Sequence, residues 1–331
     1  MRNAAYDRGA FPVYRPPVPV IAVGNLTVGG TGKTPLVGWL VKYARGKNAR
    51  PVILSRGYGR SSTGVRVVSD GTHVLTDARE GGDEPVQLAR SFPDVPIVVG
   101  ESRSDAAREA LSRFQPGVLL LDDAFQHRAI ARDLNILVVD GSRDLADEGL
   151  LPAGRRREPL SALGRASVVV FTHTDPATGQ AVGEGTVRER FKGDILMCTR
   201  TIGSFAESGG NVLAPALLKN ARCVLISGIG NPDRFERDVR ALGLDVTEHL
   251  RYRDHYRYTG ADVQAMVEAA VRSSAHRFVT TEKDMVRLMA VPDAMGLLEA
   301  RGPVTAAVLD VQVHPAGILE SHIDAVLGRT A

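Results

Sequence analysis

A short glycine-rich segment places the strongest constraint on how this chain can fold. It joins residues 19–25, an apolar run typical of a β-strand, to residues 35–47, which predict a helix. The segment consists of Thr27, Val28, Gly29, Gly30, Thr31, Gly32, Lys33 and Thr34. In a strand–loop–helix unit of this kind, successive backbone N–H groups wrap phosphate oxygens and the helix N-terminus adds positive potential. We therefore expect a nucleotide phosphate-binding loop in which Lys33 reaches the β- and γ-phosphates and the Thr34 hydroxyl holds Mg²⁺.

The segment departs from the usual phosphate-loop pattern at one position. Thr27 stands where glycine is usual, at the start of the loop. Gly29 and Gly30 supply backbone flexibility instead, and Pro35 falls in the first helical turn, where its missing N–H costs little. A glycine-rich turn beside a surface lysine is the structural alternative. The coincidence of Gly-Lys-Thr with a preceding strand and a following helix favours the phosphate loop.

Two adjacent acids are candidates for the metal side of the site. Asp122 and Asp123 follow the apolar run Val118–Leu121, and a carboxylate there can bind Mg²⁺ directly or through water. Both acids could instead form a turn or cap a helix. Asp140, which follows its own apolar run, competes with them for the metal-side role.

The apolar runs predict the fold class. Residues 117–123, 135–140 and 167–175 are apolar over most of their length and end in or near an acid. Runs of this kind suit central parallel strands that helices cover on both faces, and acids at their carboxyl ends would lie at the ligand edge of the sheet. We predict an α/β protein with a P-loop NTPase-like, doubly wound, mostly parallel sheet and a second, smaller α/β domain.

Composition along the chain predicts the domain boundaries. The length of 331 residues is compatible with two medium-sized domains. Residues 204–212 are small and polar, which predicts a linker, and an alternation of strands and helices restarts after them. We therefore expect a P-loop nucleotide-binding domain at 1–203, a linker at 204–212 and a smaller α/β domain at 213–331.

Charge and cysteine usage exclude several classes of protein. The net charge is +3, and the densest basic run, residues 155–157, has no interleaved aromatic side chains, so we expect no nucleic acid partner. Cys198 and Cys223 lack CxxC spacing, which argues against a disulfide framework or a zinc site and favours a reducing compartment. No apolar run approaches the ~18 residues of a membrane span, so we expect a cytoplasmic or peripheral protein without a transmembrane helix.

Nine short segments, in order between about residues 18 and 310, match one known family. They are VGNLTVGGTGKTP (23–35), ILSRGYGR (53–60), GDEP (82–85), ESRSDA (101–106), LLLDDAFQHR (119–128), LPAGRRREP (151–159), GIGNPDRF (228–235), RDHYRYT (253–259) and TEKD (281–284). Each segment is weak alone, but nine in this order are specific. On these segments the chain resembles the tetraacyldisaccharide 4'-kinases of bacterial lipid A synthesis.

The resemblance implies an activity and its ligands. It implies that the γ-phosphate of ATP, with Mg²⁺, passes to the 4'-hydroxyl of a tetraacyldisaccharide 1-phosphate and gives lipid IVA. It also implies work on the cytoplasmic face of the inner membrane, with a smaller domain that closes the lipid substrate cleft; we infer no obligate protein partner. Family members commonly carry a hydrophobic helix before the segment that is here 6–20, and this sequence begins too late to include one. We therefore expect contact with an anionic membrane surface through exposed apolar side chains and arginines.

The resemblance also implies roles for individual residues. Asp83 of GDEP is implied to act as general base together with His255 of RDHY. Asp122 and Asp123 are implied on the metal side, and Arg103 of ESRSDA is implied to meet phosphate. A kinase for a phosphorylated lipid needs guanidinium partners for at least two anionic groups, which makes the arginine at position 157, Arg157, a further candidate.

The residues by themselves also allow less specialised roles. Asp83 could cap a helix, His255 could lie in a solvated loop, and Arg103 and Arg157 could be solvated surface charges. Two other functions fit the same phosphate loop: a soluble P-loop kinase or ligase for a small metabolite, and a nucleotide-gated switch protein. Against the switch, residues 172–175 (THTD) have the acid of the guanine-specifying Asn-Lys-x-Asp pattern but neither its Asn nor its Lys.

Overall fold

The structure is a computed structural model that describes residues 2–174 and 179–328. Asp175, at the end of the predicted run 167–175, lies outside the described residues. The chain divides into two compact units: Met1–Arg200 with Val311–Ala331 form the first, and Thr201–Asp310 form the second. Two strands, β8 (Asp194–Glu207) and β13 (Val304–His314), each contain residues of both units.

The predicted linker at 204–212 is wrong. These residues hold the end of β8, a turn and the start of β9 (Val212–Leu213), which pairs antiparallel with β8. The turn reverses the chain at Gly210, which has a φ of 94° and donates its N–H to the Glu207 carbonyl at 2.9 Å. The small polar composition therefore serves a tight turn, for which glycine is suited because it tolerates positive φ.

The C-terminal segment also departs from the predicted boundary, because the residues after Asp310 belong to the first unit. This segment includes α11 (Ile318–Leu327), whose Asp324 accepts hydrogen bonds from the Tyr43 hydroxyl at 2.9 Å and the Lys47 ammonium at 2.8 Å. These partners are 281 and 277 positions away in the sequence. No local pattern indicates pairs at such a separation.

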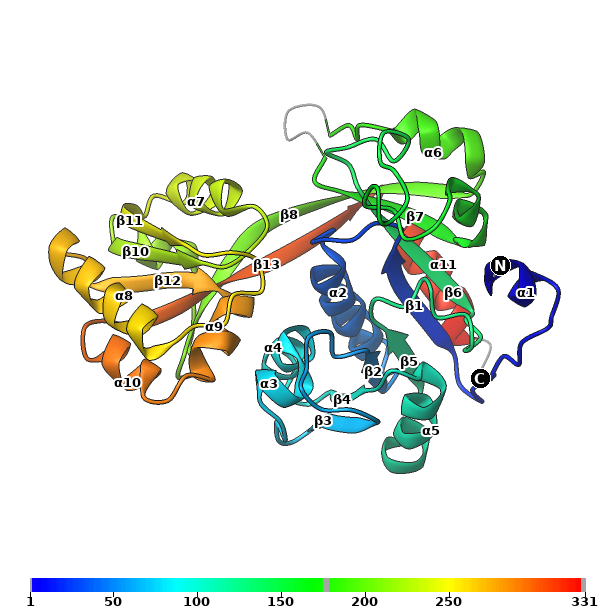
Figure 1. The fold of residues 1–331 in the computed structure, drawn as a ribbon, viewed down its shortest axis with the longest axis horizontal. Helices are drawn as coiled ribbons and strands as arrows, with labels where there is room; N and C mark the ends of the chain where they lie inside the picture. Colours follow the sequence, from blue (N-terminus) through cyan, green and yellow to red (C-terminus); the bar gives the residue numbers. More distant parts are fainter. Residues whose placement is uncertain (1, 175–178, 329–331) are drawn as a thin grey trace. The chain divides into compact units, whose positions relative to one another are not determined.

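A mostly parallel sheet forms the first unit, which confirms the predicted fold class (Figure 1). The strand order is β3-β4-β2-β5-β1-β6-β7-β8, and along this path β3 pairs antiparallel with β4 while the other neighbours pair parallel. The strands before β8 are β1 (Val20–Asn25), β2 (Pro51–Ser55), β3 (Arg66–Asp70), β4 (Pro96–Val99), β5 (Val118–Leu121), β6 (Leu134–Asp140) and β7 (Val168–Thr172). The chain leaves β1 towards one side of the sheet and returns on its other side with β6. The carboxyl end of β1 is therefore a topological switch point, where α/β proteins bind ligands.

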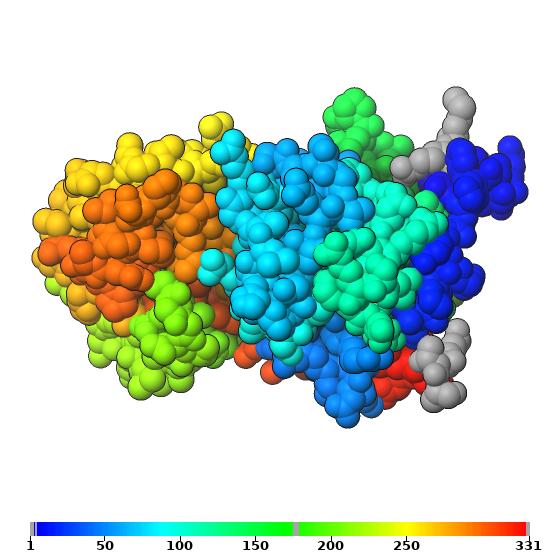
Figure 2. Space-filling model, turned by 90° about the horizontal axis from the view of Figure 1, so that it is seen from below, coloured from blue at the N-terminus to red at the C-terminus, as the bar shows by residue number. Residues whose placement is uncertain are grey.

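Continuous apolar runs explain why these strands are central. All residues of β1, β2, β5 and β7 are buried, as expected for parallel strands covered on both faces. The helices of this unit are α1 (Arg2–Asp7), α2 (Lys33–Gly46), α3 (Ala78–Gly81), α4 (Asp83–Ser91), α5 (Arg103–Phe114), α6 (Glu184–Arg190), α11 and the 3₁₀ helix η1 (Leu160–Arg165). In Figure 2 the cyan and teal side chains of β3 to α5 form part of the outer surface of this unit.

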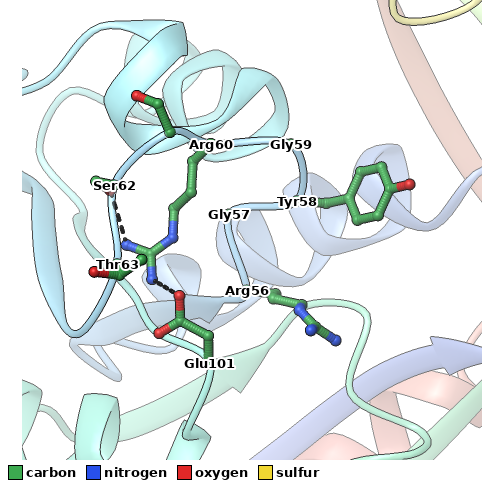
Figure 3. Close-up of a pocket in the computed structure, with 9 residues that line it drawn as sticks. Arg56, Gly57, Tyr58, Gly59, Arg60, Ser62, Thr63 and Glu101 are labelled. Carbon is green, nitrogen blue, oxygen red and sulfur yellow. Dashed lines mark hydrogen bonds and ion pairs between the residues drawn. The ribbon is translucent and has the colours of Figure 1, made fainter.

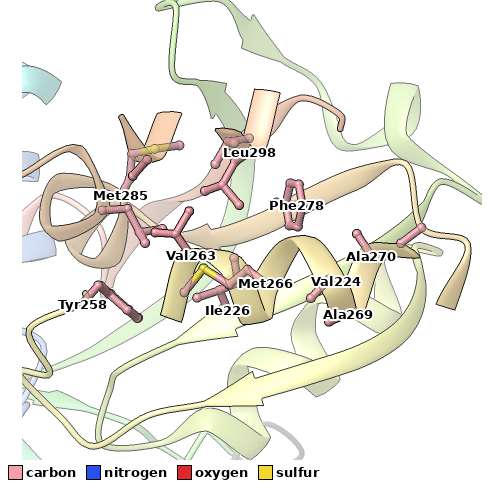
Figure 4. Packing of buried hydrophobic residues seen from close by; sticks show 14 of the residues in the cluster. Val224, Ile226, Tyr258, Val263, Met266, Ala269, Ala270, Phe278, Met285 and Leu298 are labelled. Carbon is pink, nitrogen blue, oxygen red and sulfur yellow. The ribbon is translucent and has the colours of Figure 1, made fainter. Parts of the chain in front are cut away.

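The second unit is the smaller α/β domain that the sequence predicts. Its parallel strands follow the order β11-β10-β12-β13. Its further elements are β10 (Arg222–Ser227), β11 (Asp245–Arg251), β12 (Arg277–Thr281), α7 (Pro232–Ala241), α8 (Gly260–Ser273), α9 (Glu282–Met289), α10 (Ala294–Glu299) and the 3₁₀ helix η2 (Pro215–Leu218). Val263 and Met266 of α8 pack with Phe278 of β12 and Leu298 of α10 in a buried apolar core (Figure 4). Within the described ranges, 2–174 and 179–328, no helix is both long and apolar enough to cross a bilayer.

Candidate active site

The phosphate loop has the backbone geometry that its glycines predict. β1 ends at Asn25 and α2 begins at Lys33, so the loop lies at the switch point of the sheet. Gly32 occupies the N-cap position of α2 with a φ of 80°, and Gly29 has a φ of 108°. Residues with a Cβ rarely adopt these angles. No described side chain caps α2, so its first N–H groups face the loop as an anion-binding end.

Two strand ends hold the loop in this shape. The Asn25 side chain donates a hydrogen bond to the Thr31 hydroxyl at 3.0 Å, and the Thr172 hydroxyl at the end of β7 donates to the Thr31 carbonyl at 2.7 Å. All three residues are buried, where hydrogen bonds are stronger than in water. Hydrogen bonds from the ends of β1 and β7 therefore hold the loop in place.

The arginine-rich segment 155–157 packs along the loop. The Val28 N–H donates to the Arg155 carbonyl, and the Arg155 guanidinium donates to the Val28 carbonyl, each at 2.9 Å. Thr27 forms an antiparallel β-bridge with Arg156. A β-bridge favours a β-branched residue over glycine. This contact accounts for the threonine at the position where a glycine is usual.

Asp122 lies at the end of β5 and is completely buried. The Ser55 hydroxyl at the end of β2 donates to its Oδ2 at 3.4 Å, and its Oδ1 has no hydrogen-bond partner among the described residues. Burial and the negative charges of Glu84 and Asp123 raise the pKa of Asp122 above its usual value. A nearby cation would stabilise the ionised form of such a carboxylate. The orphaned oxygen therefore fits a metal-side role.

Asp123 is held between two cations. Its Oδ1 lies 3.5 Å from Lys33 Nζ of the phosphate loop, and its Oδ2 lies 3.0 Å from Arg157 Nη1. Burial alone would raise the pKa of Asp123, but the charges of Lys33 and Arg157 outweigh burial and lower it below its usual value. The structure therefore brings together Lys33, Asp123 and Arg157, which come from three segments of the sequence.

The competing acid Asp140 has other partners. It ends β6, on the opposite side of β1 from β5. Its Oδ1 accepts a hydrogen bond from the Ser142 hydroxyl at 2.7 Å and lies 3.2 Å from His173 Nδ1. Asp123, rather than Asp140, therefore lies beside Lys33, and the metal-side role of the aspartate pair stays a prediction.

Arg103 is not a solvated surface charge, and that alternative is wrong. It opens α5 and is only 2% exposed. Its guanidinium donates to the carbonyl of Gly100 at 2.7 Å and to the carbonyl of Asp122 at 3.2 Å. Burial lowers the pKa of Arg103 to about 10, so the group stays protonated at neutral pH. This buried guanidinium therefore supports the backbone of the turn that carries Asp122 and Asp123, which we call the aspartate turn.

Asp83 is the first helical residue of α4, and Gly82 occupies the N-cap position with a φ of 91°. The alternative in which Asp83 caps this helix is therefore wrong. A Cβ added at Gly82 would lie 3.0 Å from the Cα of Gly57, so the turn before Asp83 packs closely on the segment after β2. A carboxylate in the first turn of a helix is stabilised by the helix dipole.

His255 belongs to the second unit, in the loop between β11 and α8. Its backbone has a φ of 59°, and its side chain is 40% exposed. Its ring nitrogens face two side chains of α9: Nδ1 lies 3.3 Å from Arg287 Nη2, and Nε2 lies 3.3 Å from Lys283 Nζ. Because Asp83 and His255 lie in different units, their joint action stays a prediction.

The structure adds one feature that the sequence analysis did not assign. A cavity of about 400 Å³ opens beside the segment after β2 (Figure 3). Arg60 crosses it to form an ion pair with Glu101 at 2.6 Å. The lining residues are Arg56, Gly57, Tyr58, Gly59, Arg60, Ser61, Ser62, Thr63 and Glu101. The signal in the sequence was the polar, glycine-containing stretch directly after a buried strand, which is where α/β proteins place ligand-binding loops.

Comparison with known proteins identifies the family. A family model described as "Tetraacyldisaccharide-1-P 4'-kinase" matches residues 1–328. The chain belongs to this family. It is 38% identical to the tetraacyldisaccharide 4'-kinase of Chlorobium luteolum over 94% of this chain and 88% of that protein. It is also 38% identical to the tetraacyldisaccharide 4'-kinase of Anaeromyxobacter sp. (strain K), over 99% of this chain and 86% of that one.

A solved structure extends the family likeness to three dimensions. The "apo" form of LpxK from Aquifex aeolicus in complex with ATP matches with a TM-score of 0.77 and 31% identity, over 98% of this chain and 94% of that chain. Together with the family match, this confirms the predicted family, the α/β fold class and the enzyme class of an ATP-dependent kinase. The roles of individual residues in a tetraacyldisaccharide 4'-kinase remain predictions for this chain.

Proposed function

We propose that this protein transfers the γ-phosphate of ATP to the 4'-hydroxyl of a tetraacyldisaccharide 1-phosphate and so forms lipid IVA. The proposal rests on one observation. The phosphate loop, with Gly32 at the N-cap of α2, lies at the switch point of the sheet, where Lys33 contacts Asp123 and Asp123 contacts Arg157. Phosphoryl transfer needs mainly positioning and charge neutralisation, and this cluster supplies both.

The residues of the first unit divide this work. The N–H groups of the loop and of the first turn of α2 bind phosphate oxygens, and Lys33 neutralises charge on the γ-phosphoryl group. Arg157 holds Asp123 in place through its bond of 3.0 Å. Arg103 holds the backbone carbonyl of Asp122. The phosphate contact that the family resemblance implies for Arg103 would be a further bond of a guanidinium that already donates to the carbonyls of Gly100 and Asp122.

The oxygen groups of this site suit Mg²⁺. Thr34, Asp122 and Asp123 would hold the ion, which neutralises charge on the β- and γ-phosphates when bound. No group of three or more His, Cys, Asp or Glu side chains that could hold a metal occurs among the described residues. Mg²⁺ commonly binds through one or two carboxylates, waters and substrate phosphates. Such a site matches two carboxylates, one of them with an orphaned oxygen.

Asp83 is proposed as the base that accepts the proton of the 4'-hydroxyl, and His255 as the group that assists it. Replacing either residue by alanine should lower kcat by about 10²- to 10⁴-fold, the usual contribution of general acid–base catalysis. If both act in the same step, the double variant should be little slower than the slower single variant. Fully additive losses of kcat would reject the joint role.

The site of action is proposed to be the cytoplasmic face of the inner membrane. The lipid substrate requires contact with a bilayer, and Leu150 and Leu151 expose 44% and 51% of their surface beside the arginines of 155–157. Such a surface binds anionic lipids partly through charge, so high salt should release it. Binding to anionic vesicles that persists in high salt would show deep insertion instead.

Transfer of labelled phosphate tests the activity. The protein, radiolabelled γ-phosphate ATP and tetraacyldisaccharide 1-phosphate are combined in detergent micelles, with Lys33→Ala as the inactive control. The labelled lipid should appear with the wild type and should fall strongly with the control, while the control keeps a cooperative thermal transition. Label on a water-soluble hydroxyl acceptor in place of the lipid would favour the small-metabolite kinase.

A further inference from the structure

One acid at the ligand edge of the first sheet has no role in the site described above. Asp140 ends β6, which pairs with β1 on the side opposite to β5. This pairing sets Val138 opposite Asn25, the last residue of β1, so Asp140 lies at the same edge of the sheet as the start of the phosphate loop. The carboxyl ends of parallel strands form the edge at which α/β proteins bind ligands.

Asp140 holds the imidazole of His173, the residue that follows β7. His173 Nδ1 lies 3.2 Å from Asp140 Oδ1, which also accepts a hydrogen bond from the Ser142 hydroxyl at 2.7 Å. Burial alone would raise the pKa of Asp140, but the hydrogen bonds from His173 and Ser142 outweigh burial and lower this pKa well below its usual value. The carboxylate is therefore ionised and can only accept, so Nδ1 donates to it. Because the two side chains are only 17% and 18% exposed, this bond restricts the orientation of the ring.

The end of β7 lies directly against the phosphate loop. The Thr172 hydroxyl donates to the Thr31 carbonyl at 2.7 Å, and a Cβ added at Gly32 would lie 3.4 Å from Thr172 Cγ2. His173 comes next in the chain and has a φ of 55°. Residues with a Cβ rarely adopt a positive φ, and those that do are frequent at ligand sites. His173 is therefore one residue away from a contact with the loop.

The contacts of Lys33 indicate how ATP is oriented on the loop. Lys33, which is proposed to neutralise the γ-phosphoryl group, lies 3.5 Å from Asp123, and Asp123 also contacts Arg157. These groups place the γ-phosphoryl end on the β5 side of β1. The rest of ATP then extends to the other side, over the ends of β6 and β7 (Figure 1). Arg200 of β8 adds a cation on this side, because its Nη1 lies 3.0 Å from the position of a Cβ added at Gly32.

We propose that the adenosine group of ATP lies over the carboxyl ends of β6 and β7 in contact with the His173 ring, and that Asp140 is a positioning residue that holds this ring. A flat imidazole offers a surface on which a purine stacks. An ionised carboxylate is tolerated beside the uncharged adenosine group, whereas it would repel the phosphates unless a cation lay between them. This inference rests on the use of ATP in the function proposed above and not on the lipid acceptor.

Calorimetric titration with two ligands separates the two ends of ATP. ATP carries adenosine and three phosphates, whereas inorganic tripolyphosphate carries the phosphates alone. Both are titrated with Mg²⁺, and without lipid, into the wild type and His173→Ala. The variant should raise the Kd of ATP by about 5- to 150-fold, the usual loss when an aromatic side chain that stacks on a base is removed. The Kd of tripolyphosphate should stay unchanged.

A variant of Asp140 tests its positioning role. Asp140→Asn removes the charge that holds the ring, so it should weaken the binding of ATP but not that of tripolyphosphate. If Asp140 acts only through the imidazole, the same substitution should have no further effect on ATP binding in a His173→Ala background. Additive losses of ATP binding in the double variant would reject the positioning role.

Two control variants frame these measurements. In His322→Ala the matched pair is disrupted, because His322 Nε2 lies 2.7 Å from Asp194 Oδ2 in the same unit. Asp194 begins β8, so this pair lies at the amino ends of the parallel strands, at the edge opposite to the loop. The Kd of both ligands should therefore stay unchanged. Lys33→Ala should weaken both ligands, because this lysine meets the phosphates.

Photolabelling locates the base in the wild-type protein, so this measurement does not depend on whether a variant folds. The protein is irradiated with 8-azido-ATP, and the labelled tryptic peptides are sequenced by mass spectrometry. The label should lie on the peptide 166–188, at or next to His173, and an excess of ATP should prevent it. Labelling confined to other peptides would overturn the inference.

The titrations give further decisive results. Unchanged ATP binding in a folded His173→Ala variant would overturn the inference. An equal loss of ATP and tripolyphosphate binding would also overturn it, because the substitution would then act through the phosphate loop. If the titrations and the labelling are as expected but no labelled lipid forms in the transfer assay, the proposed lipid acceptor fails and the adenosine contact stands.

Discussion

Gly24→Ala should disturb the active site through packing alone. Gly24 lies in β1, one residue before its end, and has no positive φ that would exclude other residues. A Cβ at this position would lie 2.4 Å from the backbone nitrogen of Phe125 and 2.6 Å from its Cβ. Ordinary contact begins at 3.4 Å, so the turn after β5 must move by about 1 Å. That turn carries Asp122 and Asp123.

The size of the effect follows from this overlap. Overpacking a tight core costs about 1 to 3 kcal/mol, and a domain of this size loses about 2 to 4 °C of melting temperature per kcal/mol. We therefore expect a decrease of about 2 to 12 °C in melting temperature. A displacement of about 1 Å at catalytic groups costs up to about 100-fold in rate. The loss of activity should therefore be larger than the loss of folded protein alone would cause.

The assay combines differential scanning calorimetry with labelled-phosphate transfer at saturating ATP and lipid. Gly46→Ala is the matched control, because Gly46 ends α2 with nothing within 4 Å of an added Cβ. Alanine there should keep activity and raise stability by up to about 1 kcal/mol. A Gly24→Ala protein with unchanged melting temperature and kcat would refute the packing argument.

Two further predictions concern the rest of the chain. Burial raises the pKa of Cys198 to about 11 and that of Cys223 to about 12, so thiol reagents at neutral pH should label neither cysteine until the protein is denatured; stoichiometric labelling of the native protein would contradict this. A hydrogen bond with His249 lowers the pKa of Glu236 to about 2, below its unfolded value, so its stabilisation is present above about pH 4.5 and is lost as pH falls towards 2. Glu236→Gln should therefore lower the melting temperature at pH 7 by the equivalent of about 1 to 2 kcal/mol, and this difference should shrink in acid; a difference independent of pH would exclude the ionised Glu236 carboxylate as its cause.

The sequence alone predicted the parts of the site that are local in the chain. A β-branched apolar run, a glycine-rich segment and a helix follow one another within about thirty residues, and their periodicity and turn chemistry are enough to predict the strand–loop–helix around Lys33. The buried run before Asp122 and Asp123 likewise predicted a central strand with acids at its carboxyl end. Fold class followed from the alternation of such runs.

The tertiary structure decided everything that depends on which distant segments meet. Arg157 reaches Asp123 across 34 positions, and α11, which belongs to the first unit, follows the residues of the second unit in the sequence. Whether Arg103 is buried beneath the aspartate turn depends on strand order and helix packing, and a polar arginine in an amphipathic stretch looks the same in the sequence in either case. The same applies to residues 208–210, where glycine and serine allow a linker or a tight turn. Local patterns record the preferences of a segment, whereas these outcomes depend on the neighbours that folding places around it.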